Sequence, residues 1–304
     1  MDDGDEEGGR VVFAEQRNLA SAEKTSLISV GVDIGSSTSH LVFSRLKMEQ
    51  RDGQYLAVER EVIYDSDIFL TPYTDQKTID SEKLGEFISG QYGSAQIRSD
   101  EVDTGAIILT GLAVRKENAR AIGELFALET GKFVSVSTGD KMEATMAALG
   151  SGALVNSREI GVNVMNVDIG GGTTKIAICA KGKIVGLTAV NIGARVIAFD
   201  KNKVVTKIEE TGYFFAKEAG LNLSSGTEIT TADCEKIAEC MAIRLEDIIA
   251  LRVPSSQDEL LYRLKPIDWR GEIDALTFSG GVSEFIYDYE KRSFGDLGPF
   301  LAQA

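Results

Sequence analysis

Histidine and cysteine are scarce in this chain of 304 residues, and their scarcity excludes several kinds of site. His40 is the single histidine, so a His-rich metal site and any Ser-His-Asp triad not built on that residue are excluded. The three cysteines, Cys179, Cys234 and Cys240, form no C-x-x-C pair, which argues against a disulfide framework and against zinc or thiol redox chemistry. We therefore expect buried thiols, and we expect His40 on the face of a strand.

Basic residues and long apolar runs are also lacking. Lys and Arg total 32 against 47 Asp and Glu, and the net charge of −15 would repel a phosphate backbone, so no nucleic acid partner is expected. Apolar runs such as residues 106–109 fall far short of the roughly 20 residues that span a bilayer. The acidic N-terminus is unlike a secretory signal. No membrane partner and a cytoplasmic location are predicted.

The length of the chain exceeds that at which one hydrophobic core stops growing, which predicts two lobes. Acidic residues among glycines dominate residues 1–10, and we predict that residues 1–27 are a mostly disordered tail. Strand-like runs then alternate with helical ones, such as a predicted helix at 116–128, which indicates an α/β class. Lobe I is expected over 28–160 and lobe II over 161–304.

A repeated motif is the most informative feature of the sequence. Residues 32–35 and residues 167–170 both have the sequence VDIG, 135 positions apart. Each copy ends an apolar run and is followed by small hydroxyl or glycine residues and then a second strand-like run. A duplicated strand-turn-strand unit is predicted, one copy in each lobe.

The two turns are suited to binding an anion. Asp33 precedes small residues that would let backbone N–H groups approach a phosphate, and Asp168 precedes three consecutive glycines. An ordinary hairpin turn is the alternative for each copy. If the two loops face each other, they would clamp a polyphosphate and its divalent ion, with the carboxylates holding the ion or orienting water. Lys175 is interpreted as a strand residue rather than a phosphate ligand.

Three motifs resemble those of the actin, Hsp70 and sugar-kinase ATPases. Residues 30–38 and 166–174 are similar to the first and second phosphate motifs, and residues 278–283 to the adenosine motif. The resemblance implies an α/β, two-lobed actin/Hsp70-like ATPase fold of duplicated RNase H-like mixed sheets with flanking helices. Residues 143–152 resemble the connecting helix of Hsp70-like members, which implies that Glu143 lies near the metal or the attacking water. An exposed helix position is the alternative for Glu143.

The same resemblance implies ATP or ADP and Mg²⁺ as cofactors. Asp33 and Asp168 are the implied metal residues, Asp33 acting through metal-bound water. Asp168 or Glu143 would orient the attacking water, and the choice between them stays open. The implied nucleotide-binding residues are Gly35, Ser36, Ser37, Thr38, Gly170, Gly171, Gly172, Thr173, Thr174, Gly280, Gly281 and Val282.

A closer resemblance is to the ethanolamine ammonia-lyase reactivating factor (EutA) family. It covers roughly residues 28–300 and is carried by residues 29–46, 109–111 with 115–119, and 276–284. The RKENA stretch at 115–119 is the more discriminating part. It implies an ATP-dependent, chaperone-like factor that releases damaged cobalamin from the adenosylcobalamin-dependent ethanolamine ammonia-lyase. That lyase is the implied partner, and the cytoplasm or a bacterial microcompartment the implied location.

One departure from the family pattern keeps other functions open. Full-length members run well beyond the adenosine motif, whereas residues 284–304 are all that follow it here, so a C-terminally truncated chain is expected. An actin-like nucleotide-binding scaffold or filament protein with slow or no ATPase activity is one alternative. A small-molecule kinase of the same superfamily is another, and it would need an additional substrate-binding Asp. A homo-oligomer is also left open.

Overall fold

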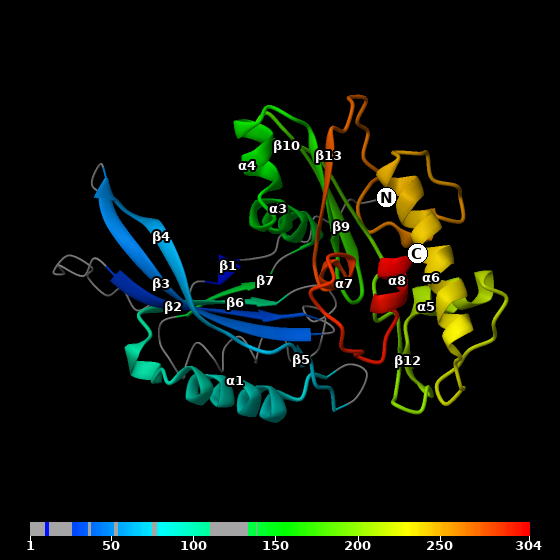
Figure 1. The fold of residues 1–304 in the computed structure, drawn as a ribbon, viewed down its shortest axis with the longest axis horizontal. Helices are drawn as coiled ribbons and strands as arrows, with labels where there is room; N and C mark the ends of the chain where they lie inside the picture. Colours follow the sequence, from blue (N-terminus) through cyan, green and yellow to red (C-terminus); the bar gives the residue numbers. More distant parts are fainter. Residues whose placement is uncertain are drawn as a thin grey trace. The chain divides into compact units, whose positions relative to one another are not determined.

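The computed structural model of the chain describes residues 10–11, 26–35, 38–51, 54–74, 78–109, 133–137 and 139–304. Its contacts divide the chain into two compact units, unit 1 over Met1–Gly139 and unit 2 over Asp140–Ala304 (Figure 1). Each unit has its own sheet and its own hydrophobic core.

Unit 1 is built on one mixed sheet of seven strands. Its order is β1-β7-β6-β2-β3-β4, and β5 pairs with β3. The strands β2, β3 and β4 are antiparallel neighbours, while β6 and β7 run parallel to β2. The elements are β1 (Arg10–Val11), β2 (Ser26–Ile34), β3 (Thr38–Arg51), β4 (Gln54–Asp65), β5 (Phe69–Leu70), α1 (Ser81–Ala95), the 3₁₀ turn η2 (Ser99–Glu101), β6 (Thr104–Leu109) and β7 (Phe133–Ser137).

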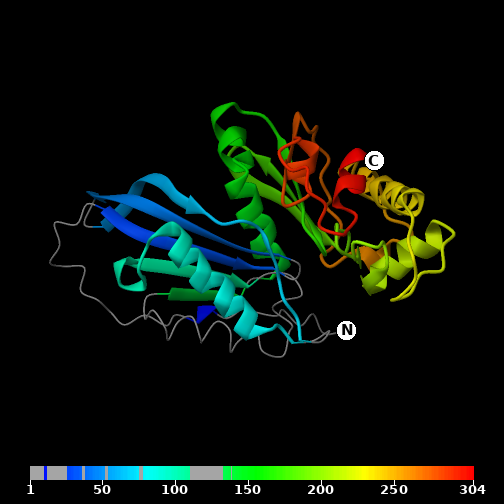
Figure 2. The same ribbon diagram turned by 60° about the horizontal axis from the view of Figure 1, so that its bottom comes forward.

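The core of unit 1 lies between its sheet and α1, which covers one face of the sheet (Figure 2). Alternate residues at the end of β2 are buried, as the two-residue period of a strand dictates. Leu84 and Ile88 of α1 complete the same cluster. The helix begins after Asp80, whose carboxylate accepts a hydrogen bond from the Lys83 N–H and so satisfies a free donor of the first turn.

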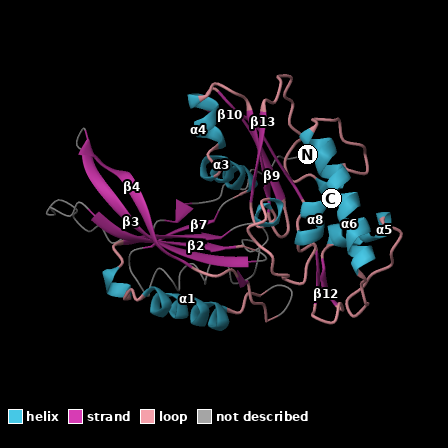
Figure 3. Ribbon diagram, in the orientation of Figure 1, coloured by secondary structure: helices cyan, strands magenta, loops and turns pink. Residues whose placement is uncertain are grey.

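Unit 2 contains a four-stranded sheet of order β10-β9-β8-β13 and a two-stranded sheet of β11 and β12 (Figure 3). In the larger sheet β8, β9 and β10 are antiparallel neighbours and β13 is parallel to β8. The elements are α3 (Asp140–Gly150), α4 (Ala153–Glu159), β8 (Val164–Ile169), β9 (Thr174–Ala180), β10 (Lys183–Val190), β11 (Ile197–Phe199), β12 (Val205–Ile208), α5 (Glu210–Glu218), α6 (Thr231–Ile249), η4 (Glu259–Leu261), β13 (Ala275–Ser279), α7 (Ser283–Ile286) and α8 (Gly298–Gln303).

Both faces of the larger sheet of unit 2 are covered, so every residue of β9 is buried. α3 and α4 pack on one face, and α6 contributes to the core on the other. α6 presents one apolar stripe to this core, since Ile237, Met241, Leu245 and Ile248 are all buried. The N-cap of α6 is Thr230, whose hydroxyl accepts the N–H of the third helical residue.

The predicted duplication is confirmed by the sheets. The order β4-β3-β2-β6 in unit 1 and the order β10-β9-β8-β13 in unit 2 have the same strand directions. Asp33 is paired with His40 across β2 and β3, and Asp168 with Lys175 across β8 and β9. The α/β class with duplicated, RNase H-like mixed sheets is therefore correct, and unit 1 carries the additional parallel strand β7 beyond β6.

The division into units differs from the predicted lobes. It falls after Gly139, whereas the sequence placed the boundary at 160/161, because α3 and α4 pack against β8, β9 and β10. Two short stretches of the predicted 1–27 tail form strands, β1 and the start of β2. The rest of that tail, the predicted helix at 116–128 and the 115–119 stretch lie outside the described residues.

The sparse residue types are placed largely as expected. His40 lies on β3, and Cys179 and Cys234 are buried free thiols, whereas Cys240 is half-buried. Burial raises the pKa of all three thiols, that of Cys234 to about 11. No helix in the described part of the chain is long and apolar enough to cross a membrane.

Candidate functional site

The glycine loop between β8 and β9 is held by its carbonyl groups. The Gly170 N–H donates to the Thr173 carbonyl oxygen at 3.0 Å and closes the turn. The Ala194 N–H donates to the Gly170 carbonyl at 3.0 Å, and the Arg195 N–H to the Gly171 carbonyl at 2.5 Å. The N–H groups of Gly171, Gly172 and Thr173 find no acceptor among the described residues. Adjacent unpaired N–H groups in a turn are a binding site for an anion.

Gly193 makes this anchoring possible, although it belongs to none of the sequence motifs. A Cβ atom at position 193 would lie 2.6 Å from the carbonyl oxygen of Gly171 and 2.7 Å from the carbonyl carbon of Gly172. The absence of a side chain therefore lets the segment after β10 pack directly on the glycine loop.

Asp168 is the next-to-last residue of β8 and begins a polar network that extends to β13. The Ser279 hydroxyl donates to its Oδ1 at 2.7 Å, and the Asn166 amide donates to the Ser279 hydroxyl at 3.1 Å. Burial raises the pKa of Asp168, while the Ser279 hydrogen bond and the charge of Lys175 oppose the rise. A carboxyl group held in this way can exchange a proton nearer neutral pH than an exposed one.

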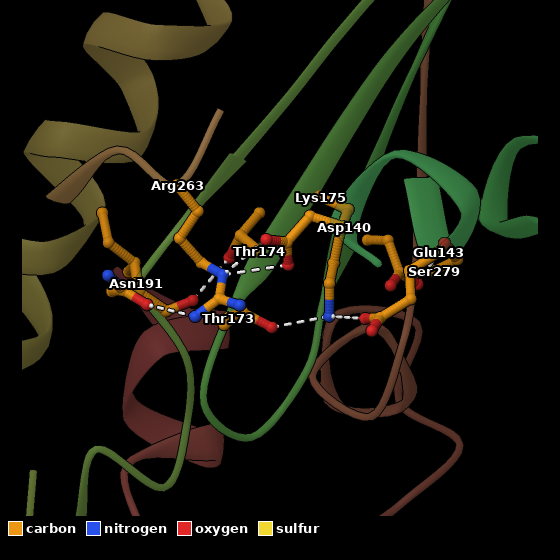
Figure 4. A network of polar contacts seen from close by, with 10 residues as sticks. Asp140, Glu143, Thr173, Thr174, Lys175, Asn191, Arg263 and Ser279 are labelled. Carbon is orange, nitrogen blue, oxygen red and sulfur yellow. Dashed lines mark hydrogen bonds and ion pairs between the residues drawn. The ribbon is translucent and has the colours of Figure 1, made fainter. Parts of the chain in front are cut away.

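Lys175 joins the glycine loop to α3. Its ammonium lies 2.5 Å from Glu143 Oε2 and donates to the Thr173 hydroxyl at 2.6 Å (Figure 4). Both charged side chains are less than one-tenth exposed. The structure therefore brings Glu143 to the same loop as Asp168, with its carboxylate paired, and Glu143 is a buried residue rather than an exposed helix position. Lys175 lies on β9 as predicted, but its ion pair was not foreseen.

The first turn of α3 is held by a second buried ion pair. The Arg263 Nε atom lies 2.9 Å from both carboxylate oxygens of Asp140, and its Nη1 donates to the Asn191 side chain at 3.2 Å (Figure 4). These charge-assisted bonds fix the start of the helix that carries Glu143. Asp140 and Arg263 are 123 positions apart, so no local pattern in the sequence pointed to them.

The turn after β13 packs on the end of β8. Gly280 has a φ of +81°, and a Cβ atom there would lie 2.5 Å from the Ile169 carbonyl oxygen. The Val282 N–H donates to that same oxygen at 3.1 Å, and the Val282 side chain is buried. Gly281 differs from Gly280 and Val282, because nothing lies within 4 Å of the position that a Cβ atom at Gly281 would take. The open face of this turn is at Gly281.

Two of the predicted nucleotide-binding hydroxyls of unit 2 are already committed to the protein. The Thr174 hydroxyl is buried and donates to the Ile192 carbonyl at 2.7 Å. The Thr173 hydroxyl accepts the hydrogen bond from Lys175. In the second loop, the groups left for a ligand are therefore mainly backbone N–H groups.

The corresponding turn of unit 1 repeats the backbone geometry. The Gly35 N–H donates to the Thr38 carbonyl at 2.8 Å, the equivalent of the bond between Gly170 and Thr173. The Thr71 hydroxyl donates to the Gly35 carbonyl at 2.8 Å and lies 3.0 Å from the Ser39 hydroxyl. Asp33 and Thr38 are exposed. Ser36 and Ser37 lie outside the described residues.

These features define a duplicated α/β protein in which β2 of one mixed sheet and β8 of the other each lead through an aspartate into a small-residue turn. The chain belongs to the ethanolamine utilisation protein EutA family, whose model matches residues 25–304. The resemblance seen in the motifs is thereby confirmed.

Two curated relatives are both named ethanolamine ammonia-lyase reactivase EutA. The chain is 32% identical over 289 residues to the protein of Salmonella typhimurium strain LT2 and 33% identical over 287 residues to that of Escherichia coli strain K12. Each match covers 91% of this chain and 61% of the relative, so the chain spans about three fifths of their length. Among solved structures, the Aquifex aeolicus Ppx/GppA phosphatase of the type II variant is 14% identical, with a TM-score of 0.45 over 86% of this chain and 69% of that chain.

Proposed function

We propose that the protein is an ATP-dependent reactivating factor for ethanolamine ammonia-lyase, binding ATP and ADP at the glycine loop of unit 2. Membership of the EutA family and the names of the two relatives support the assignment of the lyase as partner. The observation that carries the nucleotide site is the row of unpaired N–H groups at Gly171, Gly172 and Thr173 beside the partly buried residue Asp168.

The loop and the turn after β13 would divide the nucleotide between them. The three N–H groups would bind the phosphates, because they can donate hydrogen bonds to an anion without any rearrangement of the loop. Gly281 suits the adenosine, since its surroundings are open and the neighbouring Gly280 is packed on β8. Gly35 and Thr38 of unit 1 stay predictions as phosphate contacts, as do Ser36 and Ser37.

The carboxylates fit Mg²⁺ only together with a nucleotide. Among the described residues no three His, Cys, Asp or Glu side chains gather in a way that could hold a metal ion. Mg²⁺ usually binds through phosphate oxygens, water and one or two carboxylates, which is compatible with Asp168 here and with the predicted role of Asp33. When bound, the ion would neutralise charge on the phosphates.

Asp168 is the better candidate of the two for orienting the attacking water. The carboxylate of Glu143 is paired with Lys175 at 2.5 Å, so it is already engaged with another group of the protein. Asp168 lies at the loop itself, and burial raises its pKa. We therefore propose Asp168 as the water-orienting residue and Glu143 as a residue that positions Lys175 and the loop. Nucleotide hydrolysis would then drive the release of damaged cobalamin from the lyase.

Thermal unfolding with and without MgADP and MgATP tests the nucleotide site. A ligand at 100 times its Kd adds about 2.7 kcal/mol to the stability of the folded state, so the midpoint should rise clearly. Asp168→Asn should reduce the rise. Asp274→Asn is the matched control, because Asp274 caps the opposite end of the same strand pair, accepting the Asn163 N–H at 2.7 Å. Equal rises in the two variants would remove Asp168 from the site.

A reactivation assay tests the partner. Ethanolamine ammonia-lyase inactivated by damaged cobalamin would be incubated with the protein, ATP, Mg²⁺ and intact coenzyme. Recovery of lyase activity that needs ATP supports the proposal. A protein that binds MgATP and never restores the lyase would leave the nucleotide site standing and refute the reactivating function of this chain.

A further inference from the structure

Lys175 has a charged group that the proposed function does not yet use. An ammonium group has three N–H donors. Glu143 and Thr173 account for two of them, and no third acceptor is recorded for Lys175 among the described residues. The side chain is less than one-tenth exposed, so the third donor lies in a buried place with no acceptor among the described residues. A donor of this kind can take an acceptor that arrives with a ligand.

The remaining donor belongs to the group that already contacts the glycine loop. The Thr173 hydroxyl that accepts from Lys175 is on the same residue as one of the three unpaired loop N–H groups. Lys175 is also the cross-strand partner of Asp168. Lys175 is thus adjacent both to the backbone donors of the loop and to the partly buried residue Asp168.

We infer that Lys175 is a nucleotide-binding residue whose ammonium is shared between Glu143 and the phosphates, giving the loop a built-in cation. The inference rests on the proposed nucleotide site. Its consequence is that part of the affinity for a nucleotide does not depend on Mg²⁺, because a fixed positive charge remains when the metal is removed. Glu143 competes with the phosphates for the same ammonium.

The competition predicts opposite effects for the two partners of the pair. Lys175→Met removes the cation and leaves the Glu143 carboxylate near the phosphates, so ADP should bind about tenfold more weakly or worse. Glu143→Gln releases the ammonium to the phosphates, so ADP should bind about threefold more tightly or better. A purely structural ion pair would give weaker binding in both variants, because either change would disturb the loop.

The experiment is isothermal titration of the full chain with ADP, once with Mg²⁺ and once with EDTA at the same ionic strength. The variants are Lys175→Met, Glu143→Gln and the double variant, with Lys183→Met as a matched control that removes an exposed lysine of β10. Thermal midpoints without nucleotide establish that each variant is folded. The double variant contains no unpaired buried charge, so it keeps the test valid if a single variant unfolds.

The expected result is a loss in Lys175→Met and in the double variant, a gain in Glu143→Gln, and larger effects in EDTA than with Mg²⁺. Wild-type affinity in the double variant would overturn the inference, since the cation would then contribute nothing. Weaker binding in both single variants would overturn it in favour of a structural pair. Absence of ADP binding by the wild-type chain in both buffers would instead refute the proposed nucleotide site itself.

Discussion

The two copies of the strand-turn-strand unit share a backbone and differ in their side chains. In both copies the turn is closed by the same N–H to carbonyl bond, from Gly35 to Thr38 and from Gly170 to Thr173. In unit 1 the cross-strand partner of the aspartate is His40, which pairs with Asp65 at the surface. In unit 2 the equivalent residue is Lys175, which makes a buried ion pair.

The anchoring of the turn differs as well. A side-chain hydroxyl, that of Thr71, holds the Gly35 carbonyl, whereas a backbone N–H, that of Ala194, holds the Gly170 carbonyl. A backbone anchor needs close approach of two chain segments, which is where Gly193 is required. The common geometry follows from the repeated motif, and the charge and rigidity of each copy follow from residues outside it.

The largest expected effect comes from breaking the buried pair of unit 2. Lys175→Met should lower the free energy of unfolding by about 3 kcal/mol or more, because it takes away the ammonium that the buried Glu143 carboxylate contacts at 2.5 Å. Urea unfolding followed by the fluorescence of Trp269, the only tryptophan of the chain and a residue of unit 2, measures it. Adding Glu143→Gln should recover most of the loss. A loss under about 1 kcal/mol would mean that the pair is solvated like a surface one.

The backbone anchor of the second turn comes next. Gly193→Ala should cost about 2–3 kcal/mol, because its Cβ would meet the Gly171 carbonyl oxygen at 2.6 Å and backbone atoms cannot move aside cheaply. Gly281→Ala is the control, with nothing within 4 Å of the added carbon and an expected change within about 0.5 kcal/mol. The same Trp269 signal reports both. Equal stabilities would show that the loop can relax away from the segment after β10.

The turn after β2 in unit 1 should lose less stability on substitution of its anchor, since a side chain rather than the backbone anchors it. Thr71→Val removes the hydroxyl that donates to the Gly35 carbonyl and should cost about 1–2 kcal/mol. Thr71→Ser keeps the hydroxyl and should retain most of the stability. Urea unfolding followed by far-UV circular dichroism measures the difference between the two variants. If Thr71→Ser is as unstable as Thr71→Val, the methyl group rather than the hydrogen bond supports this turn.

The pH dependence of stability should reveal the carboxyl group of Asp168. Burial raises its pKa above the ordinary value of 3.8, so the native state holds this proton at pH values where the unfolded state has lost it. The contribution of this proton to the stability of the folded state is therefore complete below pH 3.8, and it is lost as the pH rises through the native pKa of Asp168. Asp168→Asn should gain stability relative to wild type over that window, by at most about 1.4 kcal/mol per pH unit. The measurement is the urea-unfolding midpoint of the wild type and of Asp168→Asn at a series of pH values. A difference between the two proteins that does not change with pH would contradict the raised pKa of Asp168.

The sequence predicted the repeated parts of the fold well, because they depend on short local patterns. The VDIG motif marks the ends of β2 and β8, and the tight turns after it bring β3 and β9 back as antiparallel partners. These elements need no knowledge of distant residues.

The site was predicted only where its residues belong to the motifs. Asp168, the loop glycines, Gly280 and Glu143 were singled out from the motifs, and their roles in a site stay predictions. Arg263 and Gly193 were missed because their roles depend on contacts with segments far along the chain or on close backbone approach. Lys175 could have been found, since a tight turn after Asp168 puts the residue seven positions later directly opposite it.

The smallest effect is expected at the residue that corresponds to Lys175 in unit 1. His40 Nε2 lies 2.6 Å from Asp65 Oδ1, but the two side chains are 37% and 62% exposed, so water and salt screen the pair. His40→Asn should therefore change the free energy of unfolding by less than about 0.5 kcal/mol in urea unfolding followed by circular dichroism. Asp65→Asn should behave alike. A cost near that of Lys175→Met would mean that the cross-strand position, and not burial, determines the energy of the pair in both copies.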